Sequence, residues 1–332
     1  MPLPFLAWGA IAAMGALGVG KTVKAGIDAK DAKDTNAAAN YIVDRAKRKI
    51  EDAKLKSKTS LDNLGKRKLD ILDTSINLFI TTYEKIKNIK LSDSEGLYEL
   101  NKFKLDKQQF DELKESGEYA SSVLAGTASG ALAGGLAAFA AYGAVGLFAS
   151  ASTGTAIAAL SGAAATNATL AFLGGGSLAA GGLGIAGGTA VLGGLVAAPA
   201  LAVMGLIVGA KASAEKDKAY SNYATAQKFE EEMKVASDAC YAIEKRSNMF
   251  HELLDDLDEL FVPLIAAMKR AILLHNGDYS YFDEDQKHAV AAARSIAGAV
   301  KAILDTPILN KDGSLTSESE EVATEIREMI SA

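Results

Sequence analysis

The chain has 332 residues and a formal net charge of −6, from 35 Lys and Arg residues against 41 Asp and Glu residues. This acidic total gives no support to nucleic acid as a partner, because nucleic-acid binding uses a concentrated basic surface. A single cysteine, Cys240, excludes an intrachain disulfide, and we expect it to be a small core side chain rather than a reactive thiol. No charged residue lies within positions 119–210, so 92 consecutive residues must be hidden from water.

Charge divides the chain into five segments. They are an apolar N-terminal helix or anchor (1–20), a basic helical arm (21–118), an uncharged Gly/Ala-rich block (119–210), an acidic coiled-coil arm (211–275) and a C-terminal helical region (276–332). The basic arm has 21 Lys and Arg against 18 Asp and Glu, which gives +3. The last two segments together have 14 against 23, which gives −9. The sequence contains no series of short β-branched runs with alternating polarity, the pattern that predicts strands. The expected fold class is therefore all-α.

The first 20 residues contain no charge and are followed by Lys21. A secretion signal carries its positive charge before the apolar stretch, so we recognise no cleavable signal here. Trp8, the only tryptophan, suits the interface between a membrane and water. We therefore interpret this segment as a terminal membrane anchor or a packed helix.

Residues 15–22, GALGVGKT, match the spacing of a phosphate-binding loop. Such a loop needs a strand before it and βαβ units around it, whereas the residues that follow have helical periodicity. Nucleotide binding is kept as a second alternative function. No nucleophile stands beside a base, and no cluster has metal-ligand spacing, so we expect no enzyme activity, no cofactor and no metal site.

The basic arm has apolar residues three or four apart over about residues 22–90, a pattern typical of a coiled-coil seam. The seam is imperfect near Ser57 and Lys68. Gly65 interrupts it, and we expect a bend there. A second, shorter helix is expected over about residues 96–117.

The acidic arm has the most regular heptad of the chain, over about residues 211–275. Its predicted seam residues are Phe229, Met233, Ile243, Phe250, Leu254, Leu257 and Phe261. Pro263 is expected to kink this helix without ending it, and the Asn-Gly pair at 276–277 is expected to end it. Two further helices are expected over about residues 284–305 and 317–331.

The two arms are similar in length and opposite in net charge. We therefore predict that they pair within one chain as a long antiparallel coiled-coil stalk, with the uncharged block at one tip. The basic residues between Arg45 and Lys68 fit either anionic lipid headgroups or the acidic arm, and we favour the acidic arm.

Within the uncharged block, small residues recur every four positions on one helix face. They are Gly126, Gly130, Gly134 and Ala138. This spacing lets helix backbones approach closely, which is how helices associate in lipid. Stretches at 122–149, 154–173 and 189–210 are each long enough to cross a bilayer. However, Ala and Gly are weakly apolar, and glycine pairs interrupt the helix. We favour conditional insertion over two alternatives, permanent spans and the packed core of a soluble helical oligomer.

The order long helix, apolar insert, long helix over residues 22–275 resembles that of α-helical pore-forming toxins of the cytolysin A and haemolysin BL type. The stretch ATNATLAFLGGGSLAAGG also resembles uncharacterised bacterial Gly/Ala-rich coiled-coil membrane proteins. The toxin resemblance implies a soluble rod that hides an apolar tongue and then exposes it to form a membrane ring. The inserting residues would then lie within 122–210.

These features predict a membrane-inserting, self-assembling helical protein that perforates or remodels a bilayer. Its expected partners are the lipid bilayer and further copies of the same chain. Its expected location is the membrane, with a soluble cytoplasmic form before insertion. The alternative is a coiled-coil scaffold or filament former that uses the Gly/Ala block as a packing interface.

Overall fold

The computed structural model describes residues 29–89, 103, 105–126, 140–141, 216–310 and 313–331. The regular elements in these residues are α1 (Ala29–Ile71), the π-helical turn η2 (Leu72–Ile76), α2 (Asn77–Tyr83), α3 (Lys107–Gly126), α9 (Lys216–His275), the 3-10 turn η9 (Tyr279–Tyr281), α10 (Glu284–Asp305) and α11 (Glu318–Ser331). The described part of the chain is therefore all-α, as predicted.

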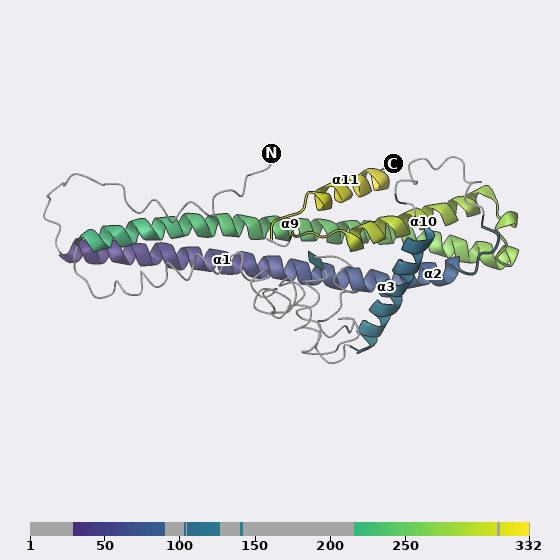
Figure 1. Cartoon of the computed structure of the whole chain (residues 1–332), viewed down its shortest axis with the longest axis horizontal. Helices are drawn as coiled ribbons and strands as arrows, with labels where there is room; N and C mark the ends of the chain where they lie inside the picture. The colour runs from purple at the N-terminus through teal and green to yellow at the C-terminus, as the bar shows by residue number, and fades with distance from the viewer. Residues whose placement is uncertain are drawn as a thin grey trace, which may run out of the picture.

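Two long helical runs lie side by side and make a rod (Figure 1). One run is α1, η2 and α2 in succession, and the other is the 60-residue α9. At about 1.5 Å per residue, α9 alone is about 90 Å long. The contact between the runs is mostly apolar and forms two clusters, with buried serines such as Ser57 and Ser60 between them. Near the start of the rod it includes Ala39, Val43 and Ile50 of α1 with Phe229, Met233 and Cys240 of α9. Cys240 is thus a buried core side chain.

The two helices of the rod run in the same direction. Side-chain hydrogen bonds that mark the register join Asn222 to Asn36, Arg45 to Glu230, Ser60 to Asn248 and Arg67 to Asp255. The two members of each pair are 185 to 188 positions apart, so residue numbers rise together along both helices. The predicted antiparallel arrangement is wrong. Similar length and opposite charge do not determine the direction of a helix pair, and the segment between α2 and α9 is long enough to return to the start of the rod.

The favoured pairing of the basic stretch with the acidic arm is found at two residues, Arg45 and Arg67. Three lysines of the stretch pair instead with acidic residues of α1 itself: Lys54 with Glu51, Lys56 with Asp52 and Lys58 with Asp62. Arg67 donates from Nε to Asp255 at 2.6 Å and from Nη2 to Asp258 at 2.9 Å. Arg45 pairs with Glu230 nearer the start of the rod. These arginines are therefore engaged within the chain. The first of these pairs is partly shielded from solvent, whereas the second is more exposed and adds little stability.

Local irregularities differ from those expected. α1 continues through Gly65, and the irregular turn is η2, which begins at Leu72. α9 also continues through Pro263 and ends at the Asn-Gly pair, as predicted. Gly277 has a φ of +76°, and a Cβ there would lie 2.5 Å from the Lys85 carbonyl oxygen. Only glycine fits this turn, where Lys87 N donates to Gly277 O at 2.8 Å and joins the ends of both runs.

Beyond that turn, α10 returns along the second half of α9, α3 crosses α1 and η2, and α11 lies on α9 (Figure 1). We call this thicker half of the rod the head.

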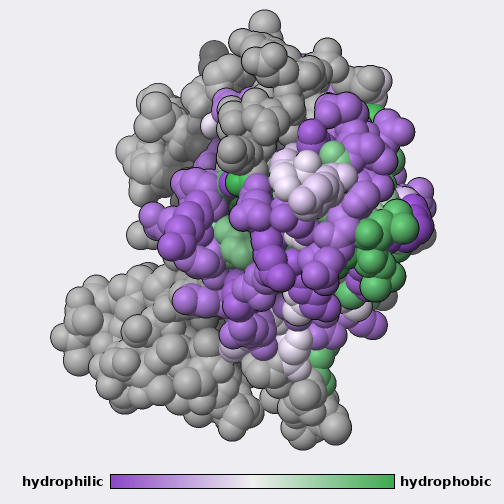
Figure 2. All heavy atoms as spheres, turned by 90° about the vertical axis from the view of Figure 1, so that its right-hand side faces the viewer, coloured by the Kyte–Doolittle hydropathy of each residue, from purple (hydrophilic) through white to green (hydrophobic). Residues whose placement is uncertain are grey.

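Asp283 and Gln286 form a capping box at the start of α10. Asp106 and Gln109 make the same reciprocal hydrogen bonds before α3, which explains why that helix begins at Lys107, later than predicted. Figure 2 looks onto the end of the head, where the described surface is mostly hydrophilic with hydrophobic atoms gathered on one side.

Candidate functional site: the clasp between α3 and the rod

The sequence-predicted residues fall into two groups. The predicted seam residues of α9 are all buried, and they are Phe229, Met233, Ile243, Phe250, Leu254, Leu257 and Phe261. Of the predicted glycine face, Gly126 is the last residue of α3. Trp8, Gly130, Gly134, Ala138 and the phosphate-loop match at 15–22 lie outside the described residues.

The uncharged block begins within α3, because residues 119–126 belong to both. The described side chains of the block are buried or, at Tyr119, Ser121 and Leu124, half-buried. Ala120, Ala140 and Ala141 are all fully buried in the core of the head. The Ala141 carbonyl oxygen also accepts hydrogen bonds from the backbone N–H groups of Ile308 (2.8 Å) and Leu309 (3.1 Å). These three alanines of the uncharged block are therefore packed into the head.

Four residues form a close polar contact between α3 and the rod. Asn77 Nδ2 donates to the Gly117 carbonyl oxygen at 3.1 Å and to Ser121 Oγ at 2.9 Å, and Ser121 Oγ donates to Asp73. Gly117 permits this approach because a Cβ there would lie 2.2 Å from Asn77 Oδ1. An aromatic contact adds to it, since the Phe110 ring lies 5.3 Å from that of Tyr83.

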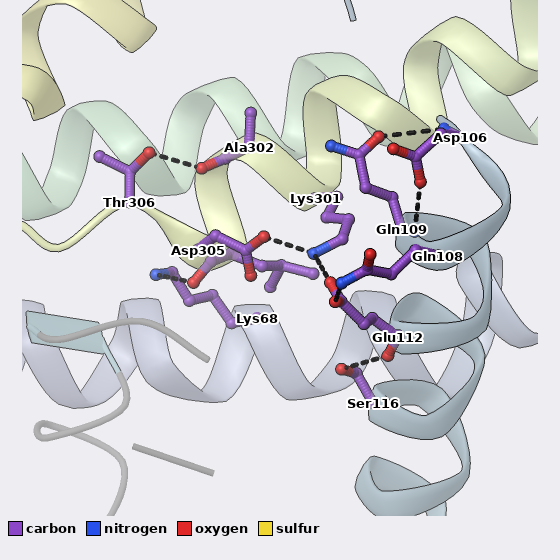
Figure 3. A network of polar contacts seen from close by, with 11 residues as sticks. Lys68, Asp106, Gln108, Gln109, Glu112, Ser116, Lys301, Ala302, Asp305 and Thr306 are labelled. Atoms are coloured by element: carbon purple, nitrogen blue, oxygen red, sulfur yellow. Dashed lines mark hydrogen bonds and ion pairs between the residues drawn. The ribbon is translucent and has the colours of Figure 1, made fainter. Parts of the chain in front are cut away.

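A second polar contact joins α3 to α10 (Figure 3). Lys301 Nζ lies 3.0 Å from Glu112 Oε2 on α3 and 2.5 Å from Asp305 Oδ2 on its own helix. Gln108 Nε2 donates to the other Glu112 oxygen at 2.9 Å. We define the clasp as Asp73, Asn77, Glu112, Gly117, Ser121 and Lys301. It ties α3 both to the rod and to α10.

The charged part of the clasp is stable to mild acid. The hydrogen bond from Gln108, with the hydrogen bond and charge of Lys301, lowers the pKa of Glu112 below its ordinary value of 4.5. Burial opposes the charge of Lys301, but Asp305 and Glu112 outweigh it and raise the Lys301 pKa. A carboxylate with a depressed pKa loses its contribution only as the pH falls through that lowered pKa. Protonation of Glu112 therefore does not open the clasp near neutral pH.

Beside the clasp, Lys68 of α1 is fully buried. Its Nζ donates to the Leu304 carbonyl oxygen at 3.5 Å, beside Asp305 (Figure 3). Burial lowers the pKa of Lys68 from 10.5 to about 7, although the charge of Asp305 partly compensates. The sequence carried a signal for this residue, because Lys68 occupies a position where the seam pattern calls for an apolar side chain. It carried no comparable signal for Glu112 or Lys301.

These features define an all-α protein with a parallel two-helix rod and a cross-helix clasped onto it. In the residues that the structure describes, no group of three His, Cys, Asp or Glu side chains could hold a metal ion. Comparison of the chain with protein-family models, with curated proteins and with solved structures gives no match. The geometry of the clasp and the uncharged block that follows it must therefore carry the functional argument.

Proposed function

We propose that the protein is a membrane-active, self-associating helical protein that stores its uncharged block on the rod and inserts it into a lipid bilayer. Insertion requires α3 to leave the rod, because the block begins in the last turns of that helix. The clasp is then the point of control. None of the helices formed by the described residues has the length and apolarity to cross a bilayer. We accordingly assign insertion to residues 119–210 as a whole.

One observation carries this proposal. A run of 92 uncharged residues needs to be shielded from water, and three of its residues, Ala120, Ala140 and Ala141, are buried in the head. The contacts that hold α3 combine the polar bonds of the clasp with apolar ones, because Leu113 and Ala120 are buried in the core of the head. The polar bonds can be exchanged for water at little net cost, about 0.5–1.5 kcal/mol for each hydrogen bond. The apolar contacts can be exchanged for contacts with lipid when the block inserts. A docked but separable helix is the arrangement that conditional insertion requires.

The rod itself favours a second candidate, a structural scaffold. Two parallel helices about 80–90 Å long make a stiff spacer, and the Gly/Ala block could join one copy to another. Both candidates involve self-association. They differ in their effect on a membrane, because a scaffold leaves vesicles sealed.

Replacing residues 122–210 by a Gly/Ser-rich linker of the same length should abolish release of a trapped dye and the part of liposome flotation that survives high salt, since salt screens electrostatic adsorption of the rod. A plain deletion is unsuitable. The start of α9 lies near Asn36, whereas α3 lies near Asn77, so about 60 Å of rod separates them. Circular dichroism of the linker variant should retain the helical signal of the rod. Unchanged flotation of that variant in high salt would count against insertion through the block, and an intact chain that leaves vesicles sealed would favour the scaffold.

A further inference from the structure

The last 16 residues of α9, positions 260–275, contain Lys269 and Arg270 but no Asp or Glu. They form the end of the rod beside the turn into α10. This part of α9 is apolar on two sides. On the inner side, Phe261, Ile265 and Met268 are fully buried in the head.

The outer side of the same segment is open. Leu273 and Leu274 are 84% and 72% exposed, more than any other large apolar residue that the structure describes. Each lies four residues after an exposed basic residue, Lys269 or Arg270, so leucine and cation share a helix face. Tyr281, 71% exposed, follows in η9. We call Lys269, Arg270, Leu273, Leu274 and Tyr281 the tip surface. Figure 2 shows hydrophobic atoms exposed together on one side of this end.

Two further basic residues lie at this end of the rod. Lys85 and Lys87 are exposed at the end of the neighbouring run. Of the acidic groups near this end, Asp285 is exposed in the first turn of α10, and Asp278 accepts hydrogen bonds from Ser280. Glu84 pairs with Lys114 at 2.6 Å, and Glu284 pairs with Lys287 at 3.1 Å. Asp283 caps α10. On α9 itself, the exposed leucines are therefore bordered by two cations, with no acidic residue within positions 260–275.

We propose that the tip surface docks on an anionic lipid bilayer and brings the rod to the membrane before the block inserts. Exposed Leu side chains enter the acyl boundary, Tyr suits the headgroup level, and Lys and Arg bind anionic headgroups. A neutral bilayer offers no partner for the cations. This inference rests on the proposed membrane activity and adds the lipid class and the docking surface.

The test places an environment-sensitive nitrobenzoxadiazole label at residue 273, through Leu273→Cys in a Cys240→Ala chain. The matched control places the label at Leu55→Cys, because Leu55 is also highly exposed (64%) but lies on α1 away from the tip. Vesicles of phosphatidylcholine with about 30% of the anionic lipid phosphatidylglycerol should raise emission at 273 at least about twofold, and doxyl lipids should quench it. Emission at 55 should stay unchanged. Pure phosphatidylcholine, or high salt, should remove most of the rise.

Several results would overturn the docking inference. They are an unchanged signal at 273, equal rises at 273 and 55, and a rise that depends on protein concentration without vesicles, which would mark a contact between two copies. A second variant, Lys269→Glu/Arg270→Glu, should weaken partition onto the anionic vesicles by about tenfold or more. An unchanged partition would also contradict the inference.

Dye release in the same samples separates the two proposals. Dye release without a rise in emission at 273 rejects docking through the tip surface but leaves insertion of the block standing. A rise in emission without dye release supports docking and counts against insertion.

Discussion

Leu254→Asp is expected to destabilise the rod more than any other single change considered. Leu254 is fully buried in the core of the head, on the face of α9 that meets the other helices. The substitution removes apolar contacts worth about 2–5 kcal/mol and introduces a carboxylate that must be buried or protonated. We expect a loss of about 4 kcal/mol or more in the free energy of unfolding, measured by urea denaturation with circular dichroism.

Leu55→Asp is the matched control, because it makes the same chemical change at an exposed position of α1. Its effect should stay within about 1 kcal/mol of zero. Equal stabilities for the Leu254 variant and the parent chain would show that this face of α9 is not a packed seam. The rod described here would then be wrong.

Lys68→Met is expected to increase stability at pH 7. The amine is fully buried, and burial depresses its pKa from 10.5 to about 7. Methionine fills a similar volume without a charge, and Asp305 keeps Lys301 as its ion-pair partner at 2.5 Å. Buried ionic groups replaced by packed apolar side chains often give a gain of about 1–4 kcal/mol. Urea denaturation at pH 7 measures the difference from the parent chain.

The pH dependence of the parent chain provides an independent check on Lys68. Between its folded pKa of about 7 and its ordinary value of 10.5, the folded chain binds fewer protons at this residue than the unfolded chain. Its contribution to stability is therefore fully present above 10.5 and is lost as the pH falls toward 7, by up to about 1.4 kcal/mol per pH unit. The methionine variant should lack this slope. Lys66→Met, at an exposed position two residues away, should retain it, and equal slopes in all three chains would contradict the assignment.

Much of the fold could be predicted from the sequence because it depends on local patterns. The seam of α9 repeats every three or four residues, so its buried face follows from periodicity alone. The ends of α10 are set by local chemistry, and its predicted range, 284–305, matches the structure. The stop after His275 follows from a turn that needs glycine.

The direction of the rod could not be predicted, because it depends on the path of the chain between two distant segments. Similar lengths and opposite net charges are compatible with either direction. The ion pairs Arg45–Glu230 and Arg67–Asp255 satisfy the same charge pattern in a parallel pair. The clasp was missed for a related reason. Glu112 and Lys301 are nearly 200 positions apart, and each resembles an ordinary surface charge in its own helix.

The central claim is that α3 must leave the rod before the uncharged block can enter a membrane. A disulfide can lock α3 in place through Asn77→Cys/Gly117→Cys in a Cys240→Ala chain. A Cβ at position 117 would lie 3.0 Å from Asn77 Cγ, the place that the sulfur introduced at position 77 would take, so the pair suits a disulfide. The measurement is release of a trapped dye from anionic vesicles, with the Asn77→Cys single variant as control. The oxidised double variant should leave the vesicles sealed, and reduction should restore release. Equal release before and after reduction, with the disulfide verified by mass, would contradict the account.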